Sequence, residues 1–242
     1  MEKFKSLFKG NYTKRQLTHY YLPLGIGLHY LFLTIAWLFF PYIEEYPYNW
    51  TTSMISRLGK PQENPIGWIF FSAAFIPLGF LLIILIPYLY QRFSKLAKRE
   101  AKIVRISLTF SSIGLIGIAA IPNFLPNIFG FFHMLNAVLI YIGMFLTVLI
   151  TPRIIFLERK KNGKENSIFP NISIKVYFIF LTYFLICTVF LAIADKGTSD
   201  RYYLPNTSTI LILSRPFWEW QAFFAAFCLL GTICFLLPEN IV

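Results

Sequence analysis

The sequence has few charged residues, and acidic residues are the scarcer kind. Only 14% of the 242 residues are Asp, Glu, Lys or Arg, whereas 57% are hydrophobic and 19% are aromatic. Soluble domains carry about 25% charged residues. A chain of this length makes only about one domain, so a large soluble core does not explain the shortfall. Lipid as the surrounding solvent does explain it.

Cysteine and histidine are also scarce, with three of each in the chain. The cysteines are Cys187, Cys228 and Cys234. They form no C-x-x-C pair, so a redox motif or a zinc site has no support, and we expect them to pack as small apolar residues. The histidines are scattered and include no H-E-x-x-H motif. We therefore expect neither a bound metal nor a cofactor.

Long apolar runs are what the sequence has in abundance. Six of them approach or exceed the roughly 20 residues that a membrane-spanning helix needs. They lie near 20–42, 65–90, 104–122, 129–156, 174–194 and 216–237. The first run is too long for the apolar part of a signal peptide and is not followed by a cleavage pattern, so we interpret it as a retained helix. We predict an all-α integral membrane protein, a single six-transmembrane-helix bundle over residues 1–242.

The basic residues are unevenly distributed between the two sides that these spans define. Of the 22 Lys and Arg residues, 17 lie in the N-terminal segment and in the 90–104 and 156–174 connections with their flanks. Such an excess marks the cytoplasmic side, so we expect both termini to be cytoplasmic. The distribution argues against nucleic acid as the partner of a chain with net charge +11. The basic loops can contact anionic lipid head groups or serve only to set the topology.

Small residues recur every three or four positions in the 104–122 and 129–156 runs. They include Gly114 and Gly117 in the former and Gly130 and Gly143 in the latter. Small residues at this spacing allow helix backbones to approach closely in lipid. We expect these two helices to be neighbours that pack through the glycines, although part of the stripe can instead face a cavity.

The polar residues that could carry chemistry converge on the side opposite the basic loops. Polar groups in a bilayer are costly, so their positions are informative. The candidate pocket residues are Ser53, Ser56, Arg57, Asn64, Asn123, His133, Asn136, Asp195, Arg215, Glu219 and Trp220. We predict a polar pocket at the depth of the outer-leaflet head groups, where an arginine could bind a lipid phosphate through two hydrogen bonds.

The same residues also have purely structural explanations. Arg215 and Glu219 are four residues apart and can pair along one helix. Trp220 can belong to an interfacial aromatic belt, and His133 can be a hydrogen-bonded bundle residue. The candidates for a catalytic site are Ser53 or Ser56 as nucleophile, His133 as base, and Asp195 or Glu219 to orient the histidine, but no single-element motif joins them.

The segment Ser53-Met54-Ile55-Ser56-Arg57-Leu58-Gly59 resembles the I-S-x-x-G element before the second helix of the Frag/DRAM/Sfk family of six-helix membrane proteins. A related group of unknown function carries a similar I-S-x-L-G element. Asn64-Pro65, Asn123, His133 and Glu219-Trp220 follow in the same order. The resemblance implies a role connected with lipid. The motif residues carried over are Ser56, Gly59, His133, Glu219 and Trp220.

We therefore expect a protein that binds, senses or organises membrane lipid at the outer-leaflet head groups, rather than an enzyme. The alternative is a lipid-modifying enzyme, a hydrolase or acyl-remodelling factor, that uses a Ser/His site. A small-solute transporter is less favoured, because no deep intramembrane charge and no internal repeat are evident.

Overall fold

The computed structural model describes residues 7–41, 48–49, 53–121, 128–194 and 215–238. Within these ranges the regular structure is entirely helical. Six of the helical segments are long and apolar enough to cross a membrane. The predicted all-α fold with six spans is therefore confirmed, and the chain is a multi-pass membrane protein.

The first span is continuous from Lys14 to Leu38 and combines three helical segments. These are α2 (Lys14–Gln16), the π-helical η1 (Leu17–Tyr21) and α3 (Leu22–Leu38). A short 3₁₀ helix, η2 (Ile55–Gly59), follows. The other spans are α4 (Gly67–Leu96), α5 (Lys98–Ala120), α6 (Ile128–Asn162), α7 (Asn171–Ile193) and α8 (Arg215–Leu236).

Several helices extend beyond the predicted apolar runs at the ends that carry lysine and arginine residues. The first span begins at Lys14 rather than near residue 20, because the Thr13 and Gln16 side chains and backbones cap its start reciprocally. It ends at Leu38, earlier than the predicted residue 42, while α6 continues to Asn162. Hydropathy locates the part of a helix that can lie in lipid, whereas capping and charged side chains decide where the helix stops.

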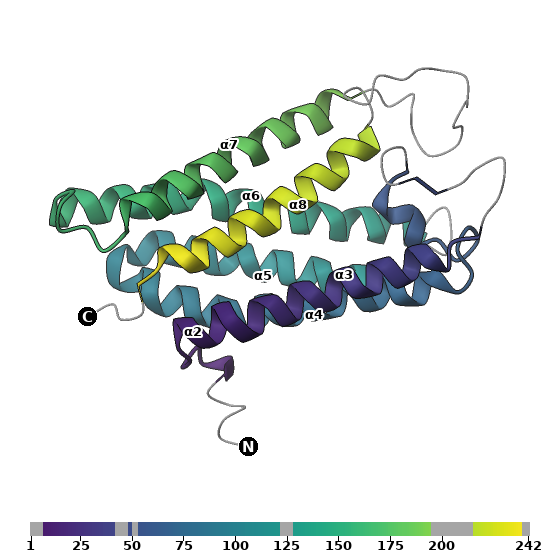
Figure 1. The fold of residues 1–242 in the computed structure, drawn as a ribbon, viewed down its shortest axis with the longest axis horizontal. Helices are drawn as coiled ribbons and strands as arrows, with labels where there is room; N and C mark the ends of the chain where they lie inside the picture. The colour runs from purple at the N-terminus through teal and green to yellow at the C-terminus, as the bar shows by residue number, and fades with distance from the viewer. Residues whose placement is uncertain (1–6, 42–47, 50–52, 122–127, 195–214, 239–242) are drawn as a thin grey trace.

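Most helices that follow one another in the chain pack as neighbours. The segment from α3 through α6 makes successive pairs, and α7 packs with α8 (Figure 1). The Tyr177 hydroxyl of α7 donates a hydrogen bond to the Val148 carbonyl of α6 at 2.6 Å. The bundle is joined on its other side where Phe223 of α8 meets His29 of α3, with ring centroids 5.4 Å apart.

The two ends of the bundle differ. At one end, called the basic end here, the first span begins, α5 and α7 begin, and α4, α6 and α8 end. The Lys14 ammonium donates to the Phe235 carbonyl at 2.7 Å, which places the start of the first span beside the end of α8. At the opposite end, η2 lies between the end of α3 and the start of α4. We call residues 53–67 the cap, and this end the cap end.

The expected glycine seam joins α5 and α6. A Cβ atom at Gly114 would lie 2.5 Å from the Asn136 carbonyl oxygen, and one at Gly143 would lie 2.2 Å from the Ser107 carbonyl oxygen. The Ser111 hydroxyl also donates to the Ile140 carbonyl across the same seam, at 3.1 Å. The prediction of close contact between these helices is confirmed for Gly114, Gly117 and Gly143.

His29 lies in an aromatic environment between α3, α4 and α8 and is fully buried. Its Nδ1 atom is 2.8 Å from the Ala74 carbonyl oxygen. Because a carbonyl can only accept, Nδ1 carries the proton. Ala74 is three residues before Pro77, where the ring of an intrahelical proline disturbs the backbone hydrogen bonds of α4. The histidine therefore ties α3 to α4 within the turn that precedes Pro77.

Candidate functional site

Two consecutive residues of α8 hold the start of η2. The Ile55 amide donates to Glu219 Oε2 at 3.0 Å. The Trp220 indole Nε1 donates to the Ser53 carbonyl at 3.3 Å. The first amides of a helix have no partner within the helix, so the carboxylate caps η2 from a different helix. Two motifs that are 164 positions apart in the sequence therefore bind each other directly.

Asn64 is completely buried and joins three parts of the cap end. Its Nδ2 donates to the carbonyls of Ala36 and Leu58, both at 3.0 Å. Its Oδ1 accepts from the Gly67 amide at 3.1 Å, at the first residue of α4. The side chain thus fixes the end of α3, the end of η2 and the start of α4 relative to one another.

The cap packs closely enough that two positions require glycine. A Cβ at Gly59 would lie 2.3 Å from the Phe71 ring. A Cβ at Gly67 would lie 2.2 Å from the Asn64 side chain and 2.5 Å from the Ala36 carbonyl oxygen. The glycine of the I-S-x-L-G element is therefore explained by packing of η2 on α4.

A chain of polar contacts runs along the surface of the cap. Ser53 Oγ accepts one hydrogen bond from Arg57 Nη1 at 2.9 Å and another from the backbone N–H of Asn49 at 3.2 Å. Arg57 Nε also binds Glu63 Oε2 at 2.7 Å, and Lys60 binds Glu63 Oε1 at 3.2 Å. One carboxylate is therefore shared by two cations. The three charged side chains are partly exposed, at 15%, 21% and 32% for Arg57, Lys60 and Glu63.

His133 lies in the second turn of α6 and is half-buried. Its Nδ1 atom is buried and has no hydrogen-bond partner among the described residues. The Lys60 ammonium is close enough to act on the ring electrostatically. In the part of the chain that the structure describes, no hydrogen bond joins His133 to Ser56. The Ser/His pair proposed from the sequence therefore lacks the direct contact of a catalytic pair.

Tyr48 is a member of this region that sequence analysis did not select. Its hydroxyl donates to the Met54 carbonyl at 3.4 Å, and its ring lies 5.1 Å from that of Phe40. Burial raises the pKa of Tyr48 well above its usual range, and the nearby Glu219 carboxylate raises that pKa further. Tyr48 therefore stays protonated and can act only as a neutral hydrogen-bonding group.

Lys60 and Glu63 were also missed by the choice of site residues. The signal for them was their spacing of three residues, directly after the I-S-x-L-G element. Without the fold, a lysine and a glutamate in a loop look like ordinary solvent-exposed residues. The structure shows that Glu63 binds both Arg57 and Lys60, and that Lys60 acts electrostatically on His133 of another helix.

Other predicted site residues fall in different places. Asn136 is buried in the α5–α6 seam, where its side chain would contact a Cβ at Gly117. Asn123 and Asp195 lie outside the described residues, as does the side chain of Arg215. The shared pocket of Ser56, Asn123, His133 and Glu219 thus remains a prediction. Among the described residues, no group of three His, Cys, Asp or Glu side chains is arranged to hold a metal ion.

Comparison with known families identifies one match. The family model described as "Protein of unknown function (DUF998)" matches residues 24–199, which run from α3 through α7 and include the whole cap. The chain belongs to the DUF998 family. Glu219 and Trp220 lie beyond the matched residues, although they hold the cap that lies within them. No curated protein and no solved structure matches the chain significantly.

The DUF998 assignment agrees with the expected likeness to an uncharacterised membrane family. It gives no support for the narrower Frag/DRAM/Sfk name. The family description assigns no activity, so the function must be argued from the residues themselves.

Proposed function

We propose that this DUF998 protein binds membrane lipid at the cap end and holds its phosphate-bearing head group at the membrane boundary. The observation that carries the proposal is the shared carboxylate of Glu63. Arg57 and Lys60 both bind it, which leaves one positive charge in excess in a partly buried cluster. A phosphate group is a suitable additional partner for such cations.

The surroundings of this cluster suit a lipid better than a free anion. Ile66 and Ile69, at the start of α4, expose 55% and 54% of their surface. Phe131 and Phe132 directly precede His133 in α6 and are exposed as well. Charged and apolar groups side by side match the two parts of a lipid at the boundary between head groups and acyl chains.

The hydrogen bonds of the candidate nucleophiles favour binding over catalysis. Ser53 is 2% exposed, and its hydroxyl oxygen already accepts two hydrogen bonds. Glu219 holds the Ile55 amide, rather than orienting a histidine as in a catalytic triad. The enzyme alternative depends on a rearrangement that brings Ser56 within hydrogen-bonding distance of His133, about 3 Å.

The proposal includes an orientation. The basic end faces the cytoplasm, together with both termini, and the cap end lies in the opposite leaflet, because Lys and Arg are retained on the cytoplasmic side. Members of the Frag/DRAM/Sfk family, which the cap sequence resembles, have been linked to lipid remodelling. That likeness points in the same direction.

Lipid retention by the purified full chain tests the proposal. The protein is reconstituted in nanodiscs with phosphatidylglycerol or with uncharged diacylglycerol, and retained lipid is counted by native mass spectrometry. Lys60→Gln should reduce retention of the phospholipid about fivefold, the effect of about 1 kcal/mol for one charge near the surface. Retention of diacylglycerol should not change, and Lys164→Gln at the basic end serves as the control.

His133 distinguishes the competing functions. His133→Ala should weaken phospholipid retention more than Met134→Ala, which changes the adjacent exposed residue of α6. His133→Gln should restore binding because its amide supplies a hydrogen-bonding group. Equal retention by Lys60→Gln and the parent protein would refute the lipid proposal. Lipid turnover that disappears in both Ser56→Ala and His133→Gln would establish the enzyme alternative instead.

A further inference from the structure

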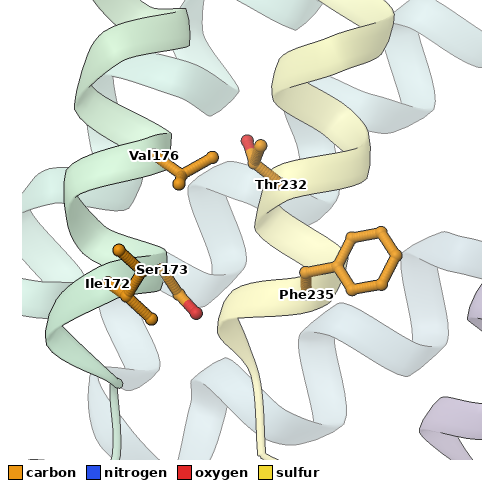
Figure 2. A pocket seen from close by; sticks show the side chains of 5 residues that line it. All are labelled: Ile172, Ser173, Val176, Thr232 and Phe235. Atoms are coloured by element: carbon orange, nitrogen blue, oxygen red, sulfur yellow. The ribbon is translucent and has the colours of Figure 1, made fainter.

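A groove lies between α7 and α8 at the basic end, far along the chain from the cap. It has a volume of about 210 Å³ and is lined by Ile172, Ser173, Val176, Thr232 and Phe235. Figure 2 shows Val176 and Thr232 facing each other across it. Ile172 and Phe235 at its opening are 69% and 54% exposed. The groove is thus open at the protein surface and is mostly apolar.

Two cations contact residues that line this groove or adjoin its lining in the chain. Lys14 donates to the carbonyl of Phe235, one of the lining residues, at 2.7 Å. Arg159 of α6 binds the Asn171 side chain through Nη2, next to the lining residue Ile172. The Nε atom of Arg159 is buried and has no hydrogen-bond partner among the described residues. The residue as a whole is partly exposed, and its guanidinium has five N–H groups, so donors outside the Asn171 contact remain for a further acceptor.

We propose that this groove binds one acyl chain of an anionic phospholipid, with the lipid phosphate held by Lys14 and Arg159. This site is separate from the cap. The cap is proposed to hold a head group, whereas the groove also takes up an acyl chain. Whole drug-sized ligands occupy pockets of about 300–1,000 Å³, so the smaller groove suits a single chain rather than a complete molecule. The flanking positive charges select an anionic head group.

The charged mouth and the apolar groove of the proposed site have different physical roles. An apolar groove that faces lipid gains little from the hydrophobic effect, because lipid chains already surround it. Specific retention must therefore come from the charged groups at its mouth, while the groove fixes where the chain enters. The head group thus supplies the selectivity and the groove supplies the position.

A photoactivatable lipid locates the chain directly. The full-length protein is placed in nanodiscs that contain phosphatidylglycerol with a diazirine in one acyl chain, and labelled residues are mapped by mass spectrometry. Labelling should be concentrated at Ile172–Val176 and Thr232–Phe235. A phosphatidylcholine carrying the same chain should label these residues several times less, because its head group has no net charge.

Variants separate a specific site from a merely basic surface. Arg159→Gln should reduce labelling about fivefold, whereas Lys161→Gln, a nearby exposed lysine of the same helix end, should not. Val176→Trp should fill the groove and displace the label, while Phe178→Trp, on the exposed side of α7, should not. Ser173→Leu provides a second groove-filling change if Val176→Trp fails to fold.

The outcomes decide the proposal independently of the cap. Equal effects of Arg159→Gln and Lys161→Gln, or labelling that persists when the groove is filled in a folded protein, would overturn it. Competition by glycerol 1-phosphate, which has no acyl chain, would show a free-phosphate site instead of a lipid site and would also overturn it. Lys60→Gln in the cap should leave groove labelling unchanged, so failure of either proposed lipid site is recognised separately.

Discussion

At the scale of single residues, the cap motifs are explained by what they touch. Glu219 and Trp220 hold the backbone of residues 53–55, and Asn64 connects three helix ends. Gly59 makes room for the Phe71 ring. These candidate site residues therefore build the cap, while Lys60 and Glu63 bind each other at its surface and belong to the proposed lipid site.

Glu219→Ala should destabilise the cap. The substitution leaves the Ile55 amide without its carboxylate acceptor, and a hydrogen bond to a charged group contributes about 1.5–3 kcal/mol. Thermal unfolding in detergent, followed together with proteolysis in the cap, would measure the change. Glu219→Gln keeps an acceptor oxygen and should recover most of the lost stability. If Ala and Gln behave alike, the Glu219–Ile55 contact has no role in stability.

Pro152 of α6 explains the position of another buried side chain. A proline at residue 152 has no amide to donate to the carbonyl of Val148, four residues earlier. The Tyr177 hydroxyl of α7 donates to that carbonyl instead, at 2.6 Å. Tyr12 likewise donates to a backbone carbonyl of a neighbouring helix, that of Ile84, at 2.7 Å. The Tyr177 hydroxyl thus satisfies the carbonyl that Pro152 leaves without its helical donor.

Tyr177→Phe should cost about 1 kcal/mol or more, because it leaves the buried Val148 carbonyl without a donor. The cost should fall in a Pro152→Ala background, where residue 152 regains an amide that can bond within α6. A double-mutant cycle of unfolding free energies measures this coupling. Additive effects of the two substitutions would mean that the tyrosine does not compensate for the proline.

At the scale of elements, the close approach of α5 and α6 depends on positions where no side chain fits. Gly143→Ala would put a Cβ 2.2 Å from the Ser107 carbonyl oxygen. Because backbone cannot yield as a flexible side chain does, the helices must separate, and we expect a loss of about 1–3 kcal/mol. Unfolding measured in mixed micelles would report the change.

Gly27 and Gly231 supply matched controls for that substitution. A Cβ at either position would meet no atom within 4 Å. Alanine there should be neutral or stabilising by up to about 1 kcal/mol, since alanine is the better helix former. If Gly143→Ala proves as harmless as Gly231→Ala, the packing seam is looser than the contacts indicate.

At the scale of the whole molecule, the proposed orientation makes a direct prediction. On a background without the native cysteines, Gln62→Cys at the cap end should react with a membrane-impermeant reagent added outside intact cells. Lys161→Cys at the basic end should react only after the membrane is opened. Both native side chains are exposed, so access should depend on membrane side rather than burial. The opposite pattern would show an inverted protein.

The linear sequence determined the class of this protein and the parts of the chain that span the membrane. Apolar runs of sufficient length require a helix in lipid, because the backbone must satisfy its own hydrogen bonds there. The glycine spacing likewise predicted the α5–α6 seam, since short-range periodicity defines a helix face. Helix ends were less predictable, as at Lys14 and Leu38, because capping and local charges decide them.

Only the tertiary structure decided the partners of the polar residues. Ile55 and Glu219 are 164 positions apart, and Tyr177 meets a carbonyl of a different helix. Sequence order placed Ser56, His133 and Glu219 at a similar depth but could not specify which faces of their helices meet. Depth follows from counting residues along a helix, whereas a contact also requires the rotation and crossing of both helices. Those are set by packing throughout the bundle, which is why the sequence indicated the cap end but not the contacts within it.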